Sequence, residues 1–118
     1  MVNKRAFPRY PTIAQARLKN LLQGEAFVKD LSITGCRLEF SAAIALSVGE
    51  IHEIEIIPEG QANVEPFELT AEVRWSLASY DSFEVGFYIL RSPRGKSFFH
   101  YLDYLAWKQN HPSSAGAS

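Results

Sequence analysis

The strongest constraint on the fold is an alternation of apolar and polar side chains in the run FELTAEVRW, residues 67–75. The odd-numbered residues of this run are apolar or aromatic, and the even-numbered residues are polar or charged. A period of two places all the odd-numbered side chains on one face of a β-strand. The run therefore predicts a strand with one face buried in a core, and it favours Trp75 in that core beside Val73.

Other short runs with apolar alternation or many β-branched residues predict further strands, at residues 14–18, 25–31, 36–40, 50–57 and 83–89. Turn-forming residues separate these runs. Many short strands at this spacing predict an antiparallel barrel or sandwich.

Near the C-terminus the period of the apolar side chains changes from two to that of a helix. Phe98, Tyr101, Leu102 and Leu105 recur at i, i+3, i+4 and i+7, which is one face of an α-helix. The helix is expected to begin either at Ser92-Pro93 or at Ser97, because serine is a good N-cap and proline a good first helical residue.

The size and composition of the chain are those of one domain. With 118 residues, 47% of them hydrophobic, it can bury a core without a disulfide or a metal. Its single cysteine, Cys36, is expected in the core, and the absence of a disulfide partner favours a reducing compartment. No apolar run reaches the ~18 residues of a membrane span. We therefore expect a cytoplasmic protein without membrane insertion.

The segment NKRAFPRYP, residues 3–11, carries three cations and no acid. Pro8 and Pro11 disfavour the helical region for the residues before them, so the cations lie on an extended arm. Residues 50–84 carry nine acids against one cation, Arg74, although the whole chain is nearly neutral at –1. A local basic arm on an acidic body indicates a small anionic ligand and no DNA or RNA partner, since long nucleic acids need a broad basic face.

The second informative stretch is DLSITG, residues 30–35, between two predicted strands. Aspartate and serine bond nearby backbone amides and glycine tolerates positive φ, so taken alone the stretch predicts a β-turn. Taken alone, the basic arm is typical of a solvated chain terminus.

Together the two stretches resemble the PilZ family, the receptors for the bacterial messenger cyclic di-GMP. The family pattern is R-x-x-x-R, here Arg5 and Arg9, followed by D/N-x-S-x-x-G, here Asp30, Ser32 and Gly35. The resemblance continues through AEVRW (71–75), EVGFYIL (84–90) and the closing helix, and covers residues 3–108.

The resemblance implies a mostly β fold, a six-stranded antiparallel PilZ-type β-barrel with a C-terminal α-helix and a flexible N-terminal arm. The expected boundaries are 1–12 for the basic arm, 13–109 for the barrel with its helix, and 110–118 for a disordered tail. The implied function is a receptor that binds cyclic di-GMP, without a cofactor, and relays the level of this messenger to a partner protein through closure of the arm.

The expected ligand contacts follow from the chemistry of the messenger. Guanidinium groups of Arg5 and Arg9 suit its phosphates and the O6/N7 edge of guanine. Asp30 can accept hydrogen bonds from the Watson–Crick edge of guanine, and Ser32 is a short donor and acceptor. Gly35 lets the backbone approach the ligand closely.

Three further residues are expected near the ligand. Lys4 stands where many relatives carry arginine. This difference leaves open whether one or two molecules of the ligand bind per chain. Arg37 lies beside the turn and is either a ligand contact or an ordinary surface arginine. Trp75 is either a stacking partner for guanine or, as the alternation favours, a core residue.

The sequence favours neither catalysis nor a metal site. His52, His100 and His111 lack the spacing of metal ligands, and no P-loop or nucleophile elbow is present. The main alternative is a small-barrel adaptor that docks a protein without nucleotide, against which the intact motifs argue. A single-stranded nucleic-acid binder conflicts with the acidic middle of the chain.

Overall fold

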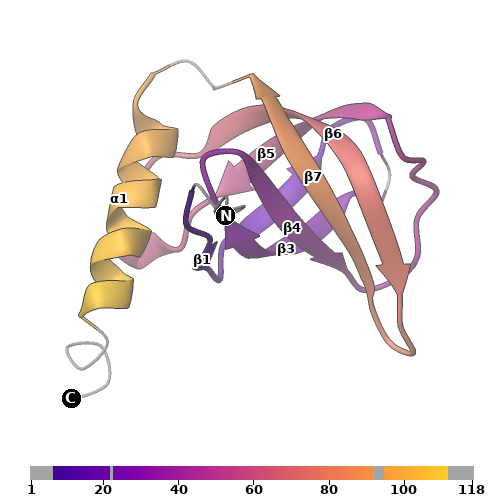
Figure 1. Cartoon of the computed structure of the whole chain (residues 1–118), viewed down its shortest axis with the longest axis horizontal. Coiled ribbons are helices and arrows are strands. Elements are labelled where there is room, and N and C mark those ends of the chain that lie inside the picture. Colours follow the sequence, from indigo (N-terminus) through magenta and orange to yellow (C-terminus); the bar gives the residue numbers. More distant parts are fainter. Residues whose placement is uncertain (1–6, 22, 92–94, 112–118) are drawn as a thin grey trace, which may run out of the picture.

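In a computed structural model, which describes residues 7–21, 23–91 and 95–111, six antiparallel strands close into a barrel with one helix beside it (Figure 1). The barrel strands are β2 (Gln15–Leu18), β3 (Glu25–Leu31), β4 (Gly35–Phe40), β5 (Ile51–Ile57), β6 (Phe67–Ala78) and β7 (Phe83–Arg91). Outside the barrel lie the short strand β1 (Tyr10–Pro11), the 3-10 helix η1 (Gly60–Ala62) and the helix α1 (Ser97–Asn110). Lys4 and Arg5 lie outside the described residues.

The strands follow the order β3–β2–β5–β6–β7–β4, and the pairing of β4 with β3 closes the circle. Every neighbouring pair is antiparallel. The predicted six-stranded antiparallel barrel with a C-terminal helix is thus confirmed. The two-residue strand β1 pairs with the end of β3, Tyr10 opposite Leu31 and Pro11 opposite Asp30, which fixes the last part of the basic arm beside the barrel.

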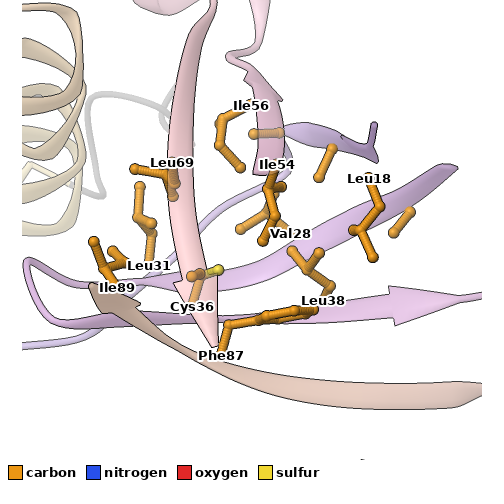
Figure 2. Close-up of a cluster of buried hydrophobic side chains, with 14 of the residues drawn as sticks. Leu18, Val28, Leu31, Cys36, Leu38, Ile54, Ile56, Leu69, Phe87 and Ile89 are labelled. Carbon is orange, nitrogen blue, oxygen red and sulfur yellow. The ribbon is translucent and has the colours of Figure 1, made fainter. Parts of the chain in front are cut away.

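The core is built from the inward-facing side chains of alternate strand residues, as the period of two predicts (Figure 2). Val28, Leu38, Ile54 and Val73 are fully buried. Cys36 is buried in the same core, as expected, and this burial, with a smaller effect of nearby Asp30, raises the pKa of its thiol to about 12.

The helix α1 begins at Ser97, which is the later of the two expected starts. Phe98, Tyr101 and Leu105 form its buried face, and the ring of Phe98 lies 5.5 Å from the ring of Phe67 at the start of β6. The face predicted from the helical period therefore packs against one end of the barrel. Within the described ranges, no helix is long and apolar enough to cross a membrane.

A partly buried polar cluster joins the arm, the helix and the β5–β6 connection. The backbone amide of Ala14 donates to Thr12 Oγ1, the Thr12 and Tyr101 hydroxyls share a hydrogen bond, and the Tyr101 hydroxyl donates to Glu59. Lys108 Nζ lies 3.6 Å from the other oxygen of Glu59. Burial, reinforced by Glu59, raises the pKa of the Tyr101 hydroxyl, so it remains a donor. Thr12 follows β1 directly, and the cluster therefore connects the arm to the helix.

Candidate functional site

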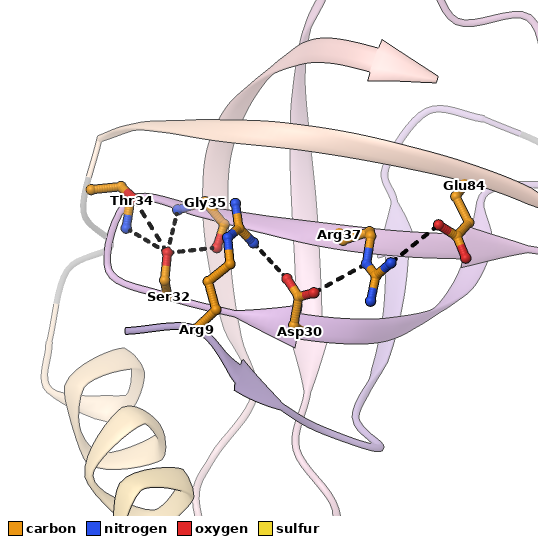
Figure 3. Close-up of polar contacts among 7 residues, drawn as sticks. All are labelled: Arg9, Asp30, Ser32, Thr34, Gly35, Arg37 and Glu84. Atoms are coloured by element: carbon orange, nitrogen blue, oxygen red, sulfur yellow. Dashed lines mark hydrogen bonds and ion pairs between the residues drawn. The ribbon is translucent and has the colours of Figure 1, made fainter. Parts of the chain in front are cut away.

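The motif DLSITG forms the turn between β3 and β4, and Ser32 holds this turn together (Figure 3). The Ser32 amide donates to the Gly35 carbonyl at 2.8 Å, and the Ser32 hydroxyl oxygen accepts from the amides of Thr34 and Gly35 at 3.2 and 3.1 Å. Ser32 is only 1% exposed. The Ser32 hydroxyl therefore points into the turn, whereas the family resemblance implied that it contacts the ligand.

Gly35 is required for close packing of two strands. A side-chain Cβ at this position would lie 2.5 Å from the backbone oxygen of Phe87 on β7, a distance that real Cβ atoms do not adopt. The φ of Gly35 is not positive, in contrast to that of Gly49 and Gly95. The freedom of glycine to adopt positive φ, which a β-turn interpretation uses, is not what this position needs.

Asp30 reaches the outer surface of the barrel because of a β-bulge. Val28 lies opposite Leu38, but Asp30 lies opposite Arg37, so Lys29 is an extra residue in β3. The bulge reverses the alternation, so that Val28 and Leu31 face the core while Asp30 faces outward. It thereby places a carboxylate beside the end of the arm.

Asp30 is the centre of a chain of ion pairs from the arm to β7 (Figure 3). Its Oδ1 lies 2.6 Å from Arg9 Nη1 and its Oδ2 lies 3.0 Å from Arg37 Nε. The Arg37 Nε–H is buried and has no aligned hydrogen-bond acceptor among the described residues, so its contact with Asp30 counts as an ion pair. Arg37 Nη1 lies 3.4 Å from Glu84 Oε1. Arg37 is thus held between the carboxylates of Asp30 and Glu84.

A pocket of about 510 Å³ opens on the outer surface of the barrel above this chain of charges. Strand register places Asp30, Arg37, Gly86 and Trp75 in one row across β3, β4, β7 and β6. The pocket is lined by Arg9, Asp30, Thr34, Gly35, Cys36, Arg37, Arg74, Trp75, Gly86, Phe87 and Tyr88. Three guanidinium groups, one carboxylate and an exposed indole therefore meet around one cavity.

A larger pocket, of about 750 Å³, lies elsewhere on the barrel, around Phe27 of β3. Four of its lining residues are acidic and one is a cation, Arg17, which is already paired with Glu55 at 2.7 Å. An anionic ligand would meet repulsion there. The smaller pocket is the better candidate site because its charges suit an anion.

Trp75 does not lie in the core, so the burial that the alternation favoured is wrong. Val73 lies opposite Phe87, but Trp75 lies opposite Gly86, which makes Arg74 an extra residue and forms a second β-bulge. Beyond this bulge the facing is reversed, and Trp75 is 42% exposed on the pocket wall.

The sequence reasoning did not nominate six residues that line the pocket, Thr34, Cys36, Arg74, Gly86, Phe87 and Tyr88. The guanidinium of Arg74 lies 4.6 Å from the centre of the Tyr88 ring, a cation–π contact at the edge of the pocket. The sequence did carry a signal for Gly86, because a glycine inside a predicted strand indicates a bulge or a close approach of another group to the backbone. Of the nominated residues, Arg9, Asp30, Gly35, Arg37 and Trp75 line the pocket, whereas Ser32 does not. Among the described residues, no group of His, Cys, Asp and Glu is placed to hold a metal ion.

Comparison with known proteins gives a family match and a fold match. Residues 3–99 match the family model described as PilZ domain. A search of the curated proteins finds no match. Among solved structures, the inhibitor of motility MotI (DgrA) from Bacillus subtilis is similar with a TM-score of 0.75 and 14% identity, over 92% of this chain and 52% of that chain.

Two structures of YcgR from Escherichia coli are also similar. YcgR in complex with cyclic di-GMP gives a TM-score of 0.70 and 14% identity, over 98% of this chain and 51% of that chain. The PilZ domain of YcgR with cyclic di-GMP gives 0.71 and 16%, over 95% of this chain and 98% of that one. At these identities the likeness shows a common fold. The chain spans about half the length of the MotI chain and of the longer YcgR chain.

Proposed function

Because this chain belongs to the PilZ domain family, we propose that it is a receptor for cyclic di-GMP and that the pocket beneath Arg9 holds the ligand. The observation that carries the proposal is the meeting of three guanidinium groups, the Asp30 carboxylate and the exposed Trp75 indole around one cavity. Arginine suits phosphate and the O6/N7 edge of guanine, and a carboxylate suits its Watson–Crick edge. An aromatic ring offers a stacking surface for the base.

Binding requires the ion pairs of the free protein to exchange partners. Both oxygens of Asp30 face cations, Arg9 on one side and Arg37 on the other. In the proposed complex, Arg9 turns to a phosphate or guanine acceptor, while Asp30 receives donors from a guanine. Arg37 keeps Glu84 as its counter-ion, so no charge at this position is left unpaired. Ser32 and Gly35 contribute by holding the β3–β4 turn that places Asp30. Lys4 and Arg5, on the arm, remain proposed contacts from the family motif.

Calorimetric titration with cyclic di-GMP tests the proposal. We expect a dissociation constant of roughly micromolar or below, about –8 kcal/mol. GTP and a short single-stranded RNA serve as controls, because each shares guanine and phosphate with the ligand without its cyclic arrangement. Equal affinity for GTP, or no heat with cyclic di-GMP, refutes the receptor function and leaves the nucleotide-free adaptor as the better description.

For the relay step, we propose that the ligand draws the arm onto the barrel and that the helix α1 responds. The contacts between β1 and α1, and the Thr12–Tyr101–Glu59 hydrogen bonds, offer a direct route from the arm to the helix. A new arm position would change the surface around Phe7, which is 48% exposed, and so the surface offered to a partner protein. The proposed receptor acts in the cytoplasm, where the lone buried Cys36 suits a reducing environment.

Amide hydrogen exchange with and without cyclic di-GMP measures this closure. We expect slower exchange at Phe7 and Arg9 in the complex, because ligand contacts available only in the closed position favour that position. Tyr10, already paired with Leu31 in β1, is expected to change less. Full protection of Phe7 and Arg9 before the ligand is added contradicts arm closure as the switch, while leaving ligand binding itself untouched.

A further inference from the structure

Gly86 lies at the centre of β7, directly beneath the indole of Trp75. A Cβ at Gly86 would lie 2.2 Å from Nε1, 2.3 Å from Cε2 and 2.8 Å from Cζ2 of the Trp75 ring. These distances are too short for any side chain, including that of alanine. The indole therefore occupies the space that a side chain at position 86 would fill.

The neighbours of Gly86 define which way the indole faces. The bulge at Arg74 turns Trp75 outward and sets it opposite Gly86, and on the other side of Gly86 the strand register places Arg37 of β4. The indole therefore lies over β7 at Gly86, and the next residue in the row is Arg37, the arginine that contacts Asp30. At 42% exposure, the ring is partly held by the barrel and partly open to the pocket.

We infer that Gly86 is a positioning residue for ligand binding, because its missing side chain seats Trp75 as a ready-made stacking surface for a guanine of the ligand. The inference rests on the proposed function and assigns a role within that site. A ring that is already held loses less side-chain freedom when a base stacks on it, so preorganisation raises affinity. With a side chain at position 86, the indole must leave the row of Asp30 and Arg37.

The competing explanation is that Gly86 serves only the packing of the barrel. The two explanations differ in whether the effect of position 86 passes through Trp75. A double-mutant cycle separates them, because a residue that acts only through Trp75 has no effect once Trp75 is removed.

The experiment uses Trp75 as its own reporter. The chain has two tryptophans, and Trp107→Phe, on the exposed face of α1, leaves Trp75 as the only one. In this background we expect cyclic di-GMP to quench the emission of Trp75. Gly86→Ala is expected to shift the ligand-free emission to the red, to increase its quenching by acrylamide and to weaken ligand binding about tenfold. Gly60→Ala is the matched control, since a Cβ at Gly60 meets nothing within 4 Å and Gly60 lies outside the pocket.

The cycle is completed with the Trp107 of the natural sequence retained and binding measured by calorimetry. Trp75→Ala is expected to weaken binding about tenfold, and adding Gly86→Ala to it is expected to change affinity less than about twofold. If Gly86→Ala alone lowers the melting temperature, the double variant recovers it, because the clashing indole is gone.

Three outcomes overturn the inference. Unchanged ligand-free emission in Gly86→Ala shows that the indole is not seated there. If Gly86→Ala lowers affinity by the same factor in the unaltered protein and in the Trp75→Ala variant, Gly86 serves barrel packing alone. No binding by the unaltered protein refutes the proposed function, and the ligand role of Gly86 with it, whereas additive losses in a protein that does bind refute the role of Gly86 only.

Discussion

Asp30→Ala is expected to lower the affinity for cyclic di-GMP at least tenfold while leaving the fold intact. Among the residues that the structure describes, Asp30 is the only acidic residue lining this pocket, so its loss removes the acceptor proposed for the Watson–Crick edge of guanine. Hydrogen bonds that involve a charged group contribute about 1.5–3 kcal/mol each, and 1.4 kcal/mol is a factor of ten. The substitution also frees Arg9 and Arg37, which Asp30 orients at 2.6 and 3.0 Å.

The fold should tolerate this change because the ion pairs of Asp30 are partly exposed. The Arg9 and Asp30 side chains are 41% and 16% exposed, and pairs of this kind contribute about 0–1 kcal/mol to stability. The expected shift in melting temperature is below about 4 °C. Calorimetric titration and thermal unfolding of the same preparation measure the two effects separately.

Matched controls come from the ion pair of Arg17 and Glu55, which has nearly the same length, 2.7 Å, and lies outside the pocket. Glu55→Ala is the control for Asp30→Ala, and Arg17→Ala is the control for Arg9→Ala, for which a loss of at least about tenfold is also expected. Both controls should bind as the unaltered protein does. Unchanged affinity of Asp30→Ala and Arg9→Ala, with unchanged melting temperatures, places the ligand elsewhere.

The parts of the fold that follow from side-chain periodicity were predictable from the sequence. Alternation over residues 67–73 and 83–89 gave strands whose buried faces are those observed, and the helical period gave the face of α1 that carries Phe98 and Tyr101. These predictions hold because burial of an apolar face is a local property, repeated along each element.

The positions of the site residues depend on two bulges that the sequence did not reveal. If Lys29 were an ordinary paired residue of β3, with no bulge there, Asp30 would face the core with Val28. If Arg74 were an ordinary paired residue of β6, Trp75 would face the core with Val73. A bulge is a property of the pairing between two strands, so a periodicity read from one strand cannot detect it. The motif resemblance nominated Asp30, which lines the pocket, without depending on strand facing.

The role of Ser32 shows a different limit. Its place in the motif implied a ligand contact, but the hydroxyl is occupied by the amides of Thr34 and Gly35 inside the turn. A serine that shapes a turn and one that touches a ligand have the same spacing in the sequence. The geometry of the turn shows the first of these roles, and the ligand contact of Ser32 stays a prediction.

Val73→Asp is expected to be the most destabilising of these substitutions, with a loss of about 3–5 kcal/mol. Val73 is 0% exposed and lies opposite Phe87, so an aspartate there must be buried as a charge among apolar side chains. Because small domains have a total stability of about 5–15 kcal/mol, the melting temperature should fall by more than about 10 °C.

The control, Leu77→Asp, also tests the bulge in β6. Leu77 follows Val73 by four residues in the same strand, so an uninterrupted alternation would place both side chains in the core and make both substitutions equally harmful. With Arg74 as an extra residue the facing is reversed, and Leu77 is 58% exposed. An aspartate at that position remains in water but lies opposite Glu84, and this like-charge repulsion limits the expected loss to about 1 kcal/mol. Thermal and urea unfolding of the two variants compare them directly. Losses of similar size would contradict the bulge, and with it the outward position of Trp75 on which the proposed stacking surface depends.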